Sequence, residues 1–147
     1  MKTLCKQVRR TCSAILLLAL AQTVFAHTTG ENYVFLNIDE DALHVRVELH
    51  QRELASQFGL QLHDEAPDTE TLQPVVDYVF DHLEISAFGQ PLPLAFKAAG
   101  RTSLPQGEFL VLHFDTPWPG ALPKALTIKQ TLFFEADSRH RGLLLIE

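Results

Sequence analysis

The segment ALHVRVELH, residues 42–50, decides the fold because its side chains alternate strictly in polarity. Every second residue is apolar, namely Leu43, Val45, Val47 and Leu49, and the others are polar, namely His44, Arg46, Glu48 and His50. Successive side chains of a strand point to opposite faces of its sheet, so this alternation predicts a β-strand with one buried and one hydrated face. We therefore expect a mainly β domain built around residues 42–50.

The residues just before this strand predict its partner. Asn32–Ile38 (NYVFLNI) is rich in aromatic and β-branched residues, which favour strands. Only the acidic residues Asp39, Glu40 and Asp41 separate the two segments, a length that suits a tight turn. The two segments together predict a β-hairpin.

The residues just after it change to a helical period. Gln51–Phe58 has apolar residues at helical spacing and is followed by Gly59, a residue that favours the end of a helix. Thr71–Leu83 repeats apolar residues at i, i+3, i+4 and i+7, with Thr71 expected as the cap and Pro74 in the first turn. We expect a short helical insertion after the second strand.

The rest of the chain is β-like again. Further strands are expected at Glu84–Phe88, Leu92–Lys97, Glu108–Phe114, Ala125–Phe134 and Gly142–Ile146. About seven short strands with one helical insertion predict a β-sandwich of immunoglobulin-like type. Its buried face is expected to include Leu43, Val45, Val47, Leu110, Leu112, Ile128 and Leu132, with the second helix against one side and His113 half-buried or in the core.

The first 26 residues predict a cleavable signal peptide. Four basic residues precede the apolar run Ala14–Ala21, and Val24-Phe25-Ala26 suits signal peptidase, which would cut after Ala26. The run is shorter than the roughly 20 residues that cross a bilayer. We therefore expect a single periplasmic, β-rich domain, residues 27–147.

Removal of this segment changes charge and cysteine content. Four of the 12 Lys/Arg, none of the 18 Asp/Glu, and both cysteines lie in the first 26 residues, so the mature chain carries a formal charge of −10 and no thiol. Such a charge repels nucleic acid and attracts cations. No later stretch is long and apolar enough to insert in a membrane, and no nucleophile, phosphate-loop or paired-cysteine motif is present. We expect a protein that is not an enzyme.

Histidine is the residue type that suggests a site. After cleavage, His27 would be the first residue, and its amine and ring nitrogen together can chelate copper or nickel. The closing segment, Leu132–Leu144 (LFFEADSRHRGLL), carries Glu135, Asp137 and His140. It is consistent either with a charged turn or with part of a metal site.

The two histidines are expected to meet if the first and last strands run parallel and side by side. His27 lies five residues before the first strand and His140 two before the last, so both would emerge at one end of the sheet. Neighbouring sheet positions are roughly 10 Å apart at most, which a five-residue lead can span. The expected ligands are His27 and His140, with Asp137 or Glu135 as an oxygen ligand.

The closing segment resembles the LFFDxDxxHRGLL phrase of the extracytoplasmic domain in HupE/UreJ-like membrane proteins. The mature start, Ala26-His27 with Asn32–Leu36, and the residues between Leu43 and Leu60 are also similar to that domain, as is Phe109–Phe114. The resemblance implies a link to nickel or other metal handling, because some hydrogenase- and urease-linked relatives take up nickel. Family members continue into transmembrane helices, whereas this sequence ends at Glu147, so a permease activity is not implied. His63–Asp68 also lacks the ligand spacing of the calcium-loop-like insertion found in many relatives.

Three functions follow as hypotheses. The first is an exported, non-enzymatic periplasmic domain, resembling the soluble part of HupE/UreJ-like proteins, that assists transition-metal handling. The second is a metal-free interaction module that docks to a membrane protein partner. The third is a histidine-brace copper protein, which needs His27 at the mature amino terminus, a second histidine and an axial aromatic residue.

Overall fold

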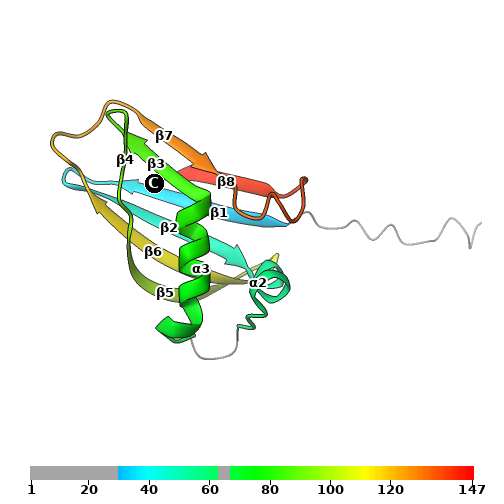
Figure 1. Cartoon of the computed structure of the whole chain (residues 1–147). Helices are drawn as coiled ribbons and strands as arrows, with labels where there is room; N and C mark the ends of the chain where they lie inside the picture. The colour runs from blue at the N-terminus through cyan, green and yellow to red at the C-terminus, as the bar shows by residue number, and fades with distance from the viewer. Residues whose placement is uncertain (1–29, 63–66) are drawn as a thin grey trace, which may run out of the picture.

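The computed structural model describes residues 30–62 and 67–147 and is mainly β (Figure 1). Its described part contains a five-stranded sheet A, in the order β5-β6-β2-β1-β8, and a three-stranded sheet B, in the order β4-β3-β7. The strands are β1 (Glu31–Ile38), β2 (Ala42–His50), β3 (Leu83–Ala87), β4 (Gln90–Pro91), β5 (Ala95–Leu104), β6 (Gly107–Pro117), β7 (Leu126–Gln130) and β8 (Arg141–Ile146). The predicted mainly β, two-layer fold is confirmed.

The expected hairpin forms the centre of sheet A. β1 and β2 are antiparallel, with Val34 opposite Val47, and the turn is closed by a 3.0 Å hydrogen bond from the Asp39 N–H to the Ala42 carbonyl. β8 lies on the other side of β1 and runs parallel to it. The first and last strands are therefore parallel neighbours, which was the condition for residues just before each strand to emerge at one end of the sheet.

The helical insertion after β2 consists of α2 (Gln51–Phe58) and α3 (Thr69–His82). Gly59 ends α2 at a φ of 66°, a left-handed conformation that glycine adopts without strain. α3 begins two residues earlier than predicted because Asp68, rather than Thr71, is its cap: the Asp68 carboxylate accepts a 2.8 Å hydrogen bond from the Thr71 N–H.

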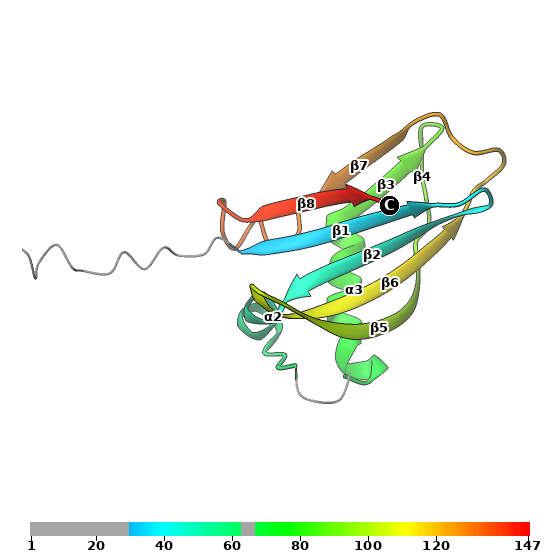
Figure 2. The ribbon, with the colours of Figure 1, turned by 180° about the vertical axis from the view of Figure 1, so that it is seen from behind.

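The core lies between sheet A on one side and α3 with sheet B on the other. Figure 1 shows α3 in front of sheet A, and the reverse view in Figure 2 shows it behind. Six residues of the predicted buried face are fully enclosed, namely Leu43, Val45, Val47, Leu110, Leu112 and Leu132, and Ile128 packs partly buried against them. Neither helix in the described part of the chain has the length and apolar character that a membrane crossing needs.

Three local predictions were wrong. Leu92–Lys97 is not one strand, because Pro91 and Pro93 remove ladder donors, and the chain instead forms the short β4 and a separate β5. The strand predicted at Ala125–Phe134 stops at Gln130 and passes into turns. His113 is exposed on the outer face of sheet A. Phe109 and Val111 lie on the same face of β6 but are buried.

Candidate functional site

The closing segment folds into consecutive turns that connect sheet B to sheet A. The Phe133 carbonyl accepts hydrogen bonds from Ala136 N and Asp137 N, both at 3.2 Å, and the Asp137 carbonyl accepts one of 2.8 Å from His140 N. Arg141 N then bonds the Gly30 carbonyl at 2.9 Å, which starts the β8 ladder. The segment thus carries the chain from the end of β7 to the start of β8.

Tyr78 of α3 holds this segment against the helices. Its hydroxyl accepts a 2.6 Å hydrogen bond from the N–H of Phe133, a buried residue with a φ of 62°, and donates one of 2.6 Å to Glu135 Oε1. Gln57 of α2 donates a second bond, of 3.1 Å, to the same oxygen. Burial raises the pKa of Tyr78 above its ordinary range. Burial alone would raise the pKa of Glu135 too, but the hydrogen bonds it accepts, led by that from Tyr78, leave it below the usual value.

His140 is buried against Asn32 of β1. Its Nε2 lies 2.7 Å from Asn32 Nδ2, which also donates a 3.1 Å bond to the Leu132 carbonyl, while Gln130 donates to Asn32 Oδ1. Because a carbonyl can only accept, Leu132 fixes the orientation of the Asn32 amide, so His140 Nε2 is an acceptor and its proton sits on Nδ1. Burial lowers the pKa of His140, which favours this neutral form.

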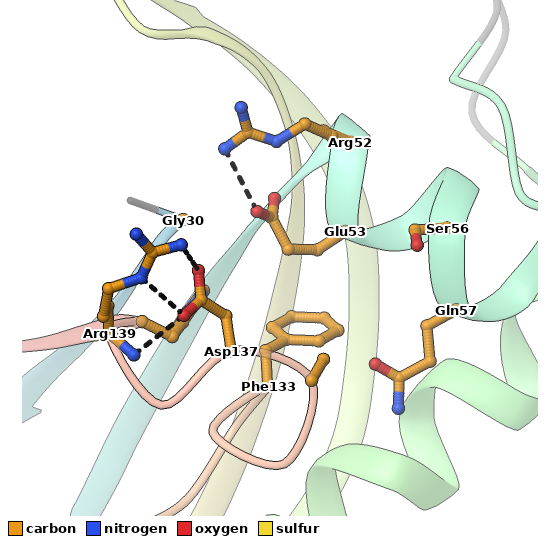
Figure 3. Close-up of a pocket in the computed structure, with 10 residues that line it drawn as sticks. Gly30, Arg52, Glu53, Ser56, Gln57, Phe133, Asp137 and Arg139 are labelled. Atoms are coloured by element: carbon orange, nitrogen blue, oxygen red, sulfur yellow. Dashed lines mark hydrogen bonds and ion pairs between the residues drawn. The ribbon is translucent and has the colours of Figure 1, made fainter. Parts of the chain in front are cut away.

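A pocket of about 280 Å³ opens beside this histidine (Figure 3). Arg52 and Glu53 enter it from α2, and Asp137 and Arg139 from the closing segment. A Cβ on Gly30 would overlap both Glu53 Oε1 and His140 Nδ1. These two polar atoms therefore lie close together beside Gly30, and they fit there because glycine has no side chain. The pocket therefore presents a carboxylate acceptor and an imidazole N–H donor close together.

Glu53 is incompletely satisfied in this position. Its buried Oε2 accepts no hydrogen bond from residues 30–62 or 67–147, although His50 Nδ1 lies 3.2 Å away. That nitrogen already accepts the 3.0 Å cap bond from Arg52 N, and His50 Nε2 lies 3.0 Å from the Gln106 carbonyl. The one lone pair of His50 Nδ1 is therefore taken up by the Arg52 N–H, and this nitrogen has no proton to donate to Glu53 Oε2.

The predicted metal ligands do not converge in the described part of the chain. His27 lies outside the described residues. Asp137 is engaged by Arg139 Nε and Nη2 at 3.1 and 3.3 Å, which holds the pKa of that carboxyl below its usual value, and Glu135 is engaged by α2 and α3. Across residues 30–62 and 67–147, no group of three His, Cys, Asp or Glu side chains is placed to hold a metal ion.

The sequence did not predict that Glu53 lies beside His140 Nδ1 in this pocket. Glu53 lies 87 residues before His140 and on a different element, so no spacing in the sequence connects them. The available signal was indirect. Gln51–Phe58 starts where β2 ends, and the hairpin places the end of β2 beside the start of β1.

A second, apolar pocket of about 620 Å³ lies at the other end of the sheets. Trp118 forms its floor and is held in place by a 2.9 Å hydrogen bond from its Nε1 to the Asp39 carbonyl and a 3.1 Å bond from its N–H to the Asp41 carbonyl. Phe88, in the turn between β3 and β4, stands at its rim with 58% of its surface exposed. The remaining lining residues are mostly proline, glycine and alanine, together with Gln90 and Leu92.

No model of a known protein family matches the chain, and no curated protein matches it either. Function is therefore inferred from the two pockets, the charge and the closing segment.

Proposed function

We propose that this chain is an exported, non-enzymatic periplasmic domain that acts as an interaction module and docks to a membrane protein partner. The observation that carries the proposal is the apolar pocket between Phe88 and Trp118. Binding sites are typically concave, largely apolar and preformed. This pocket has all three properties and contains no ionisable side chain.

Hydrogen bonds and prolines restrict the backbone around the pocket. Two backbone carbonyls hold Trp118, and Pro91, Pro93, Pro117 and Pro119 restrict the surrounding backbone. A preorganised apolar surface loses little conformational freedom on binding, and an exposed aromatic residue beside such a pocket is typical of the residues that dominate interface energies. We assign Phe88 and Trp118 as the anchors for an apolar side chain of the partner.

The closing segment supports a structural role rather than a catalytic one. Tyr78 and Gln57 engage Glu135, Arg139 engages Asp137, and Asn32 engages His140. These side chains hold the chain between β7 and β8 in place, and that accounts for the charged residues of the segment.

The docking proposal is tested with vesicles from the inner membrane of the native host. The purified domain should co-sediment with these vesicles, and it should bind neither to protease-treated vesicles nor to liposomes of the extracted lipids. Phe88→Glu should abolish binding, because it places a charge at the apolar rim. Phe80→Glu is the matched control, since Phe80 is also exposed but lies on α3, away from the pocket.

Equal binding to lipid alone would show that the partner is not a protein. Equal loss with both glutamate variants would show that binding does not use the pocket. Either result would contradict the proposal.

Export is tested separately. Amino-terminal sequencing of the periplasmic product should begin His27-Thr28-Thr29, whereas a cytosolic product that retains Met1 would contradict export.

The second candidate function is the handling of nickel or copper, alone or as a histidine-brace copper protein. It is favoured by the convergence of Glu53 Oε1 and His140 Nδ1 beside Gly30 and by the formal charge of −10 expected after cleavage. Coordination through Nδ1 would require the proton to move to Nε2, where it would meet the Asn32 amide donor. This conflict is the reason we rank metal handling below docking.

A further inference from the structure

β8 exposes an unusual amount of apolar surface for an edge strand. All six of its residues are exposed, including Leu143, Leu144, Leu145 and Ile146, the last with 70% of its surface in contact with solvent. Among the strands of the described residues, β8 pairs with β1 alone and forms the edge of sheet A (Figure 2). Natural edge strands are usually short, charged or covered, so an apolar edge of this length points to a pairing partner.

The hydrogen-bond pattern defines which backbone groups are free. Arg141 N bonds the Gly30 carbonyl and Glu147 N bonds the Leu36 carbonyl, so the odd-numbered residues of β8 point their backbone groups toward β1. Backbone groups alternate along a strand, and the even-numbered residues Gly142, Leu144 and Ile146 therefore point theirs outward, away from sheet A. These three residues offer three N–H donors and three carbonyl acceptors to an added strand.

One antiparallel register uses all of these groups when the added strand is another β8. Leu144 then pairs with Leu144 of the second copy on a two-fold axis, and Gly142 pairs with Ile146. Each of these pairs joins two even-numbered residues, whose free groups can exchange both hydrogen bonds. Shifting the register by two residues leaves at least one of the three unpaired.

The same register also matches charge. It places Arg141 opposite Glu147 of the second copy at both ends of the paired strands. In the single chain Arg141 lies 3.9 Å from Glu31 and Glu147 pairs with Arg46 at 3.0 Å, yet the Arg141 and Glu147 side chains remain 67% and 48% exposed, so each can also reach the second copy. The most exposed apolar residue, Ile146, lies opposite Gly142, where the second copy would also meet the Gln130 side chain that packs against that glycine.

From these matches we infer that two copies of this chain form a dimer through antiparallel β8–β8 pairing, which joins their two sheets A into one continuous sheet. The occupant of the edge is a second copy, because the strand is complementary to itself in backbone groups, in apolar side chains and in charge. This interface is separate from the Phe88–Trp118 pocket.

The test is analytical ultracentrifugation, which measures the molecular mass of the protein purified from cells in its accumulated form. The unmodified protein should sediment as a dimer at about 100 μM and dissociate on dilution. Leu144→Pro should be monomeric yet folded, because it removes an N–H that points away from β1, and proline is tolerated at such edge positions. Leu145→Pro is the matched control: its N–H points toward β1, so it should lower the thermal unfolding temperature strongly.

Charge reversal provides the second measurement. Arg141→Glu alone and Glu147→Arg alone should each raise the dimer dissociation constant by roughly three- to thirty-fold, since each dimer contains two such contacts. The double variant, which restores opposite charges across the interface, should recover most of the affinity.

Three results would overturn the inference. They are a monomeric unmodified protein at 100 μM, a dimer that survives Leu144→Pro, and a double charge variant that binds no better than the single ones.

Discussion

Asn32 and His140 are the residues that fix the junction of the first and last strands. Asn32 is fully buried, and its amide satisfies the Leu132 carbonyl, His140 Nε2 and Gln130 at once. A buried polar group is stable only when its hydrogen bonds are complete, so these contacts define one arrangement of the closing segment. The histidine belongs to this network first and to the pocket only through its other nitrogen.

Removing the Asn32 amide should destabilise the fold substantially. Asn32→Ala leaves a buried carbonyl and a buried imidazole nitrogen without donors, which should lower the free energy of unfolding by about 2–3 kcal/mol. Asn37→Ala, on an exposed position of the same strand, should change it by less than about 0.5 kcal/mol. Urea unfolding measures both, and similar losses would refute the role assigned to the Asn32 network.

His140 should also make stability depend on pH. Its folded pKa is lowered below the ordinary value of 6.5, mainly by burial, so the unfolded chain binds a proton that the folded chain resists. The resulting stability is present above about pH 6.5 and is lost as pH falls through the folded pKa. The urea midpoint should therefore decline between about pH 7 and 5, and His140→Gln should decline less. Parallel pH profiles for the two proteins would exclude His140 as the cause.

At this scale, the sequence predicted the burial of individual residues well and their polar partners poorly. Leu43, Val45 and Val47 follow from alternation alone, since a strand has only two faces. The pairing of Asn32 with His140 joins residues 108 positions apart, and no local pattern carries that information.

Among the secondary-structure elements, α3 stabilises the closing segment through a single hydroxyl. Tyr78 accepts from the Phe133 N–H and donates to Glu135, and its ring lies against that of Phe133 at a centroid distance of 5.3 Å. The left-handed backbone at Phe133 is unfavourable for a large residue and therefore needs such support.

Tyr78→Phe should lower the free energy of unfolding by about 1–2 kcal/mol, because it leaves the Phe133 N–H without its partner. Tyr33→Phe is the matched control, since the Tyr33 hydroxyl donates a 3.0 Å bond to the partly buried Glu31 side chain and to no backbone group in the described residues. It should cost less than about 0.5 kcal/mol. Thermal unfolding of both variants checks the prediction, and an equal loss would mean that the Tyr78 hydroxyl has no special role.

A cavity made in β2, in the middle of sheet A, should destabilise the fold. Val47 is fully buried in the middle of β2, so Val47→Ala should lower the free energy of unfolding by on the order of 1–3 kcal/mol. Thr127→Ala, at an exposed position of β7, serves as the control and should be nearly neutral. If Val47→Ala leaves the free energy of unfolding unchanged, Val47 does not lie on the buried face of β2.

Elements with a clear period were predicted closely, and those interrupted by turns were not. The bounds of β2 and α2 match their predictions because alternation and helical spacing are unbroken there. Two strand ends were not predicted. Proline removes hydrogen-bond donors at Pro91 and Pro93, and turns end β7; an apolar sequence pattern indicates neither effect.

At the scale of the whole molecule, the parallel pairing of β1 and β8 determines what lies at each end. It places Gly30, just before β1, beside His140 and Glu53, and it leaves the Phe88–Trp118 pocket at the opposite end. The sequence suggested this pairing only as a condition, because first and last strands often lie side by side but no local pattern requires it. The carboxylate beside His140 was not, because it comes from the helical insertion. The two ends offer two different functions, of which the apolar pocket supports docking and the polar pocket supports metal binding.

The measurement that tests this account most directly is calorimetric titration of copper(II) and nickel(II) into protein that begins at His27, compared with its His140→Ala variant. We predict no His140-dependent binding tighter than about 0.1 mM, because the Asn32 amide keeps the proton of His140 on the nitrogen that faces the pocket. A site that binds more tightly than this and disappears in His140→Ala would contradict the structural role of the closing segment and would make metal handling the function.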